Sequence, residues 1–359
     1  MLFGMTAVPV GPKGQSDADL YAKSIREVEM AVRLGFDSVW TLEHHFTPYF
    51  PQPDVLLYLA HVAAKYPRLG LGTAVLVLPW YHPVRLTEQI AMLNILSSGR
   101  LYLGLGRGTA RYEFDRLGVD MTETRGRFQE CVEIMRLGLA GRPFTYEGEY
   151  YRLPETQIRP IAAAPDRIQF FGAIGSPASV EIMADLALPP IQTTNFPDHM
   201  AEGFVRTWKQ LAADRGMSTE NLGLPILANP TIVRESEDEA RDLGRKFYPI
   251  FAREQMEHYE TAADYWKDLP SYESFSKMFA KLGRLAEQGK ELEAFLDNQL
   301  VGSPDRVAGR IETFRDRFAI GHVICGFAAY GMDQETSRKS AELFAGRIMP
   351  RFRKQAKAG

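Results

Sequence analysis

Eight short apolar runs alternate with longer, helix-like stretches along nearly the whole chain of 359 residues. The runs have the length of buried strands and occupy residues 2–10, 37–43, 69–79, 101–106, 167–174, 189–194, 224–233 and 321–331. This alternation predicts an α/β protein with parallel strands and right-handed crossovers, either a closed (β/α)8 barrel or a long doubly wound sheet. We favour a single (β/α)8 TIM barrel over residues 1–359, because no linker or composition break divides the chain.

Residues 255–300 interrupt this alternation. The segment is charged and helix-like, and it lies between the seventh strand and the helix predicted within 301–314. We interpret it as an insertion within the barrel. Because loops after strand ends build the active site of such barrels, we expect the insertion to form a mobile lid over the barrel mouth.

Composition excludes several classes of partner. The formal net charge of −3 and pI near 6.2 show no excess of positive charge that would favour binding to nucleic acid. Cys131 and Cys325 lie far apart and form no CxxC pair, which argues against a disulfide framework or a structural zinc site. There is no apolar run long enough to span a membrane and no signal-peptide pattern at the N-terminus. We therefore expect a cytoplasmic protein without nucleic-acid or membrane partners.

Glu43, His44 and His45 follow the second predicted strand within the stretch TLEHHFTP (41–48). Adjacent strand residues point to opposite faces, and no HExxH spacing accompanies the pair, so we expect no metal site from these two histidines. A histidine with a pKa near neutrality suits acid/base chemistry instead. A plain structural role at the strand end stays open, more for His45 than for His44.

Two glycine-containing turns follow other predicted strands. GLGRG (104–108) lacks the full dinucleotide-binding spacing, but its glycines allow close approach of a flat or phosphorylated ligand, and Arg107 could bind a phosphate. In GSPAS (175–179), Ser176 can cap a helix whose free amides attract anions. A surface ion pair for Arg107 and simple capping by Ser176 are the alternatives. Together the turns favour a phosphorylated cofactor.

These motifs carry a family resemblance. EHHFTP, the block from Gly72 to Gly108, the GSPAS turn and the closing GHVICGFAAYG resemble the bacterial luciferase-like flavin-dependent monooxygenases, most closely the luciferase catalytic subunit. The resemblance runs collinearly over nearly the whole chain. It implies a barrel that takes FMNH2 from a separate flavin reductase, activates O2 as a C4a-peroxyflavin and oxygenates a small, apolar organic substrate.

The resemblance also implies roles for individual residues. His44 becomes the catalytic histidine, with Glu43 and His45 beside it. The positions implied to bind FMN are Arg107, Gly175, Ser176 and Ser179 at the phosphate, a cis peptide at Ala74-Val75 against the flavin ring, and Gly106. Because Gly106 stands where the luciferase has a reactive cysteine, we expect open space beside the ring there.

Further expectations concern assembly and alternatives. We expect a homodimer formed through the helices within 56–64 and 90–96, where the family usually pairs. Phe46, Trp80 and Tyr112 are candidate pocket-lining rings. The alternative functions are an F420-dependent oxidoreductase that transfers hydride on the same fold, and a non-catalytic flavin-binding partner subunit.

Overall fold

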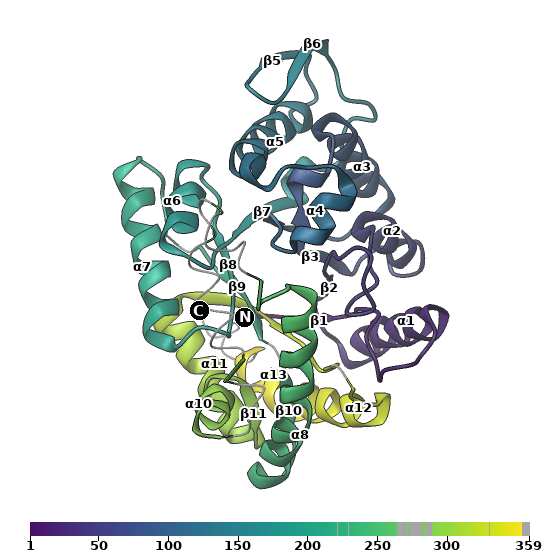
Figure 1. Ribbon diagram of the computed structural model, residues 1–359, viewed down its shortest axis with the longest axis vertical. Coiled ribbons are helices and arrows are strands. Elements are labelled where there is room, and N and C mark those ends of the chain that lie inside the picture. The colour runs from purple at the N-terminus through teal and green to yellow at the C-terminus, as the bar shows by residue number, and fades with distance from the viewer. Residues whose placement is uncertain are drawn as a thin grey trace.

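A closed parallel barrel forms the centre of the protein (Figure 1). The computed structural model describes residues 1–220, 222–228, 230–263, 269, 272, 283–284, 289–329 and 331–353. Within this part of the chain, eight strands form the barrel in the order β1-β12-β9-β8-β7-β4-β3-β2. Their bounds are β1 (Leu2–Thr6), β2 (Ser38–Thr41), β3 (Gly70–Val77), β4 (Leu101–Gly106), β7 (Ile168–Ala173), β8 (Pro190–Thr193), β9 (Leu224–Ala228) and β12 (Ile320–Cys325). The predicted (β/α)8 barrel is confirmed.

Helices connect and surround these strands, and local sequence sets where several of them begin. Ser16, Asp54 and Ser303 each accept a hydrogen bond from the backbone of the third residue that follows, so each caps the helix it precedes. The helices are α1 (Asp17–Leu34), α2 (Val55–Lys65), α3 (Pro83–Leu96), α4 (Arg111–Leu117), α5 (Thr124–Leu139), α6 (Pro177–Asp185), α7 (Asp198–Asp214), α8 (Glu237–His258), α10 (Lys290–Asn298), α11 (Pro304–Phe318), α12 (Gln334–Leu343) and α13 (Met349–Arg353). Short 3-10 turns occupy Leu78–Trp80, Met121–Glu123 and Pro165–Arg167, and a π-helical segment occupies Phe344–Ile348.

Two small sheets lie outside the barrel. The antiparallel hairpin of β5 (Phe144–Glu147) and β6 (Arg152–Thr156), predicted around Gly148, projects beyond α5 at the top of Figure 1. Near α8 and α10, β10 (Thr231–Val233) pairs in parallel with β11 (Leu300–Gly302). The run 224–233, predicted as one strand, is therefore two strands, because the chain leaves the barrel after β9.

Large side chains fill the interior of the barrel. The rings of Trp40 and Tyr102 stack with their centroids 5.7 Å apart, and Phe171, Ile191 and Leu227 pack around them. A barrel of eight strands is just wide enough for its own side chains to fill it. Any sizeable ligand space must therefore lie above these rings, toward the carboxyl ends of the strands.

The segment 255–300 is only partly described. Its first residues complete α8, and its last residues form α10 and the start of β11. Much of the middle of the proposed lid lies outside the described residues, namely 264–268, 270–271, 273–282 and 285–288, so the lid stays a prediction. Among the helices of the described chain, none is both long enough and apolar enough to cross a membrane.

Candidate active site

A cavity of about 310 Å³ opens at the carboxyl ends of the barrel strands. Its floor includes Trp40 and Leu227 from the barrel interior. The predicted site residues among those that line it are Glu43, His44, Ala74, Val75, Gly106, Arg107, Gly175, Ser176 and Ser179. Residues predicted from four separate stretches of sequence thus meet in one place. His45 is not among the described lining residues.

Glu43 connects the end of β2 with the end of β3 at the cavity wall. Its carboxylate accepts hydrogen bonds from the backbone N–H of Val77 at 2.8 Å and from the Tyr81 hydroxyl at 2.5 Å. His45 Nε2 lies 3.3 Å from the same carboxylate, and its ring meets the edge of Trp80 with centroids 5.0 Å apart. Burial raises the pKa of Glu43 despite these partners. Glu43 in the cavity wall and His45 behind it therefore form a positioning pair.

His44 turns the other way, into the cavity. Its Nδ1 lies 3.3 Å from Glu113 Oε1, and its Nε2 lies 3.5 Å from the Tyr259 hydroxyl. The two adjacent histidines thus face different carboxylates, as expected for neighbouring residues at a strand end. Burial, followed by the nearby charge of His45, lowers the pKa of His44 to about 3. The expectation of a near-neutral pKa is therefore wrong for this side chain, which is uncharged at pH 7 and can still donate from one ring nitrogen and accept at the other.

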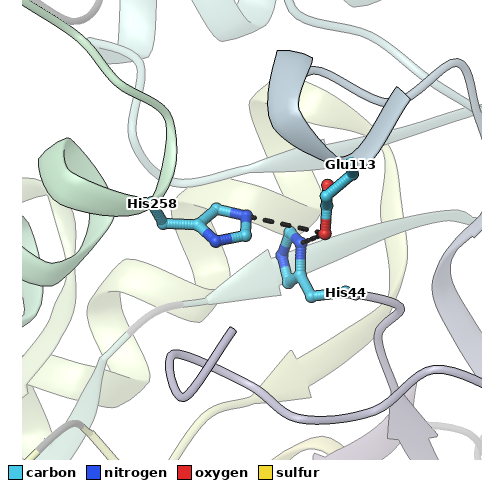
Figure 2. A group of neighbouring side chains, drawn as sticks. All are labelled: His44, Glu113 and His258. Atoms are coloured by element: carbon cyan, nitrogen blue, oxygen red, sulfur yellow. Dashed lines mark hydrogen bonds and ion pairs between the residues drawn. The ribbon is translucent and has the colours of Figure 1, made fainter. Parts of the chain in front are cut away.

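The structure adds two residues that the sequence reasoning missed, Glu113 and His258 (Figure 2). Glu113 lies on α4, accepts a hydrogen bond from the His45 backbone at 2.7 Å, and has its pKa raised to about 7 by burial. His258 ends α8, and burial lowers its pKa. A carboxylate in the loop region after β4 could have been proposed from its place after a strand end. No sequence signal connects His258 with His44.

Arg107 is a half-buried cation in the cavity wall. Its guanidinium lies over the Tyr272 ring, 5.2 Å from the centroid. The Nη1 atom is buried and finds no hydrogen-bond partner among the described residues. A buried guanidinium donor without a partner is costly, so this atom is placed to receive an anionic group of a ligand.

The GSPAS turn lines the same cavity. Ser176 is the N-cap of α6, as predicted, and its side chain accepts a hydrogen bond from the Ser179 backbone at 3.2 Å. The Ser179 hydroxyl in turn accepts from the backbone N–H groups of Gly175 and Ser176, each at 3.0 Å. Both hydroxyls and the positive end of the helix thus face the cavity that also holds Arg107, which suits a phosphate.

Flat backbone surfaces form another part of the wall. The peptide between Ala74 and Val75 is cis, as predicted. Gly106 does not open the expected space, because a Cβ atom there would lie 2.4 Å from Val75 Cγ2. The Val75 side chain already occupies that position. A side chain at position 106 would therefore require the Val75 side chain to move.

Aromatic rings complete the cavity. Trp80 lines it as predicted, together with Tyr49, Phe50, Phe251 and Tyr259. Two of the predicted rings do not: Phe46 is 58% exposed, and Tyr112 instead donates to the His45 carbonyl at 3.2 Å and is absent from the described lining. Phe46 also has a positive φ of 56°.

Comparisons with known proteins agree over nearly the whole chain. The family model described as "Luciferase-like monooxygenase" matches residues 1–319. The alkanal monooxygenase alpha chain of Photobacterium leiognathi is 25% identical over 347 residues, covering 95% of this chain and 96% of that protein. The oxygenase component of flavin-dependent trigonelline monooxygenase from Acinetobacter baylyi is 26% identical, covering 94% and 91%. The crystal structure of monooxygenase RslO1 from Streptomyces bottropensis has a TM-score of 0.80 at 26% identity, covering 98% and 100%.

Proposed function

This chain belongs to the luciferase-like monooxygenase family, and we propose that it is the oxygenase component of a two-component, FMN-dependent monooxygenase. Membership makes it an oxidoreductase that uses molecular oxygen. We propose that a separate reductase supplies FMNH2 and that the substrate is a small, apolar organic molecule. Similarity to an oxygenase component over 94% of this chain supports the two-component arrangement.

Arg107 carries the proposal for FMN. Its buried Nη1 atom has no partner among the described residues, and it lines one cavity with the hydroxyls of Ser176 and Ser179. A phosphate satisfies this guanidinium donor, because it accepts several hydrogen bonds and carries negative charge. A flavin without a phosphate leaves this donor unsatisfied. The residues present therefore fit a phosphorylated flavin.

The chain's own residues then have distinct tasks. Reduced FMN, when bound, supplies the electrons that activate O2. Arg107 and the GSPAS turn would hold the phosphate, and Gly106 with Val75 would border the ring. His44 exchanges a proton at Nε2, while Glu113 holds its Nδ1 atom at 3.3 Å. General acid or base catalysis of this kind contributes about 10² to 10⁴ in rate.

The aromatic wall supports an apolar substrate. Tyr49, Phe50 and Phe251 lie on the same side of the cavity as His44, and the rings of Phe50 and His44 are stacked with centroids 6.1 Å apart. Rings at this place bury apolar surface of a substrate and keep water from the reacting oxygen. We therefore place the substrate between His44 and these rings.

An anaerobic titration of the purified protein tests this function. We expect FMNH2 to bind at least about tenfold more tightly than reduced riboflavin, since one charge-assisted hydrogen bond contributes about 1.5 to 3 kcal/mol. Reduced F420 serves as the competing cofactor. Tighter binding of F420 than of FMNH2, with hydride transfer on adding a ketone, would replace the monooxygenase proposal by the hydride-transfer alternative. Failure of all three to bind would contradict the FMN proposal and favour a non-catalytic partner subunit that binds flavin weakly or not at all.

A further inference from the structure

Three ligand-type atoms converge at the edge of the cavity, from three separate elements (Figure 2). They are His44 Nδ1 after β2, Glu113 Oε1 on α4 and His258 Nε2 at the end of α8, and all lie within 4.8 Å of one another. The carboxylate oxygen is 3.3 Å from the His44 nitrogen and 3.9 Å from the His258 nitrogen. The exposed fractions of the His258 and Glu113 side chains are both 1%. The three atoms are therefore held close together, and His258 and Glu113 are shielded from bulk water.

Hydrogen bonding within the described chain leaves this cluster incomplete. His258 Nε2 is buried and has no hydrogen-bond partner there, since 3.9 Å to Glu113 is too long for a hydrogen bond. Glu113 Oε1 accepts from the His45 backbone at 2.7 Å, which leaves it a second lone pair. Leaving a buried polar atom unsatisfied costs about 1 to 3 kcal/mol. The Nε2 atom of His258 thus points to a position where a further group is needed to bind it.

The far nitrogens of both rings have hydroxyl neighbours. His258 Nδ1 lies 2.8 Å from the Tyr112 hydroxyl and 3.2 Å from Thr47 Oγ1. His44 Nε2 lies 3.5 Å from the Tyr259 hydroxyl. Histidines that bind metal ions usually have such a partner on the other ring nitrogen, which fixes the ring and its tautomer. This arrangement points the inner nitrogens of both rings at the Glu113 carboxylate.

We propose that His44, Glu113 and His258 form a binding site for a divalent transition-metal ion, Zn²⁺ or Fe²⁺. Two imidazoles and one carboxylate are a ligand set that both ions accept, with bonds of about 2.0 to 2.2 Å to zinc. Such bonds place neighbouring ligand atoms about 3 to 3.5 Å apart, so a small rotation of the His258 ring completes the site. Because His44 and Glu113 also line the cavity, a further coordination position opens toward it.

The ion changes what His44 can do in the proposed reaction, and this consequence rests on the proposed function. Without an ion, an ionised Glu113 favours the proton on His44 Nδ1, which leaves Nε2 as an acceptor. With an ion on Nδ1, the neutral ring carries its proton on Nε2 and becomes a donor there. Metal occupancy therefore selects between the basic and the acidic form of the same nitrogen.

Titration of the flavin-free protein with Co²⁺ tests the site, because cobalt replaces zinc and its visible absorption reports coordination. We expect one equivalent to bind, with a band that Zn²⁺ abolishes. His258→Gln and Glu113→Gln should each weaken binding more than about 100-fold, since loss of a mere outer partner already costs 10- to 100-fold. The matched control is His45→Gln, whose side chain faces Glu43 instead and should leave Co²⁺ affinity unchanged.

Several outcomes would overturn the proposal. These are the absence of a saturable cobalt band in the wild-type protein, equal affinity in His258→Gln, or an equal loss in His45→Gln. Circular dichroism shows whether each variant folds. If His258→Gln does not fold, the Co²⁺ affinity of Glu113→Gln decides whether the site exists. Because no flavin is present, failure of the metal site and failure of the FMN proposal are distinguishable.

Discussion

Replacing Arg107 with methionine probes the proposed phosphate site with little change in volume. The substitution removes the charge and the Nη1 donor, which has no partner in the described chain. Methionine keeps an unbranched apolar stem against the ring of Tyr272, which the guanidinium covers at 5.2 Å. The expected loss is therefore in binding the phosphate rather than in packing the cavity wall.

The magnitude follows from the kind of bond that is lost. A hydrogen bond to a charged group contributes about 1.5 to 3 kcal/mol, and 1.4 kcal/mol corresponds to a factor of ten. We expect the affinity of Arg107→Met for FMNH2 to fall roughly 10- to 100-fold, and its affinity for reduced riboflavin to change less than about threefold. Riboflavin has the same ring without the phosphate, so the difference isolates the phosphate contact.

The assay is an anaerobic fluorescence titration of both variants with both flavins. Arg111→Met is the control, because Arg111 lies nearby on α4 but its side chain is 47% exposed and faces Asp115 at 3.7 Å. It should bind both flavins as the wild type does. Equal losses for FMNH2 and riboflavin in Arg107→Met would refute the assignment of Arg107 to the phosphate.

Three other predictions concern different parts of the protein. His44→Ala should bind FMNH2 with nearly unchanged affinity but divert its oxidation to hydrogen peroxide, lowering the oxygenation rate by about 10² to 10⁴; undiminished product yield per flavin would contradict the role of His44. Burial raises the pKa of Glu27 to about 8 from an ordinary 4.5, so the wild type loses stability as pH rises between these values. Glu27→Gln should remove that loss. The difference in free energy of unfolding between the variant and the wild type, measured in urea, should be more favourable to the variant at pH 8 than at pH 5 by on the order of 3 kcal/mol. An equal difference at both pH values would show that Glu27 does not titrate. Leu57 on α2 and Met92 on α3 are 70% and 48% exposed, where the homodimer is expected. Light scattering should give a dimer for the wild type and a monomer for Leu57→Glu with Met92→Glu, and a monomeric wild type would remove the prediction.

Regular features of the barrel could be predicted because each one depends on neighbouring residues. The alternation of apolar runs with helix-like stretches correctly predicted where each barrel strand lies. Ser16 and Ser176 correctly predicted the starts of two helices. The run 224–233 was assigned as one strand because its residues are apolar throughout. The run is divided into two strands because its second part, β10, pairs with β11. That pairing joins residues nearly seventy positions apart in the sequence.

The site residues could be predicted where motifs follow strand ends. The burial of these residues and the space around them could not, because both depend on tertiary packing. Strand ends place His44, Arg107 and Ser176 around one cavity. Burial of His44, which sets its low pKa, depends on rings contributed by α8 and its neighbours. The space beside Gly106 depends on how the Val75 side chain lies across the strand. These features arise from tertiary contacts that no local pattern encodes.

Stopped-flow absorbance tests whether this chain binds FMNH2 and directs its reaction with O2. The protein is mixed anaerobically with FMNH2 and then with aerated buffer. We expect bound FMNH2 to be oxidised in more than one phase, through a transient spectrum distinct from those of reduced and oxidised FMN. Oxidation in a single phase, at the rate and with the spectra of free FMNH2, would contradict this expectation.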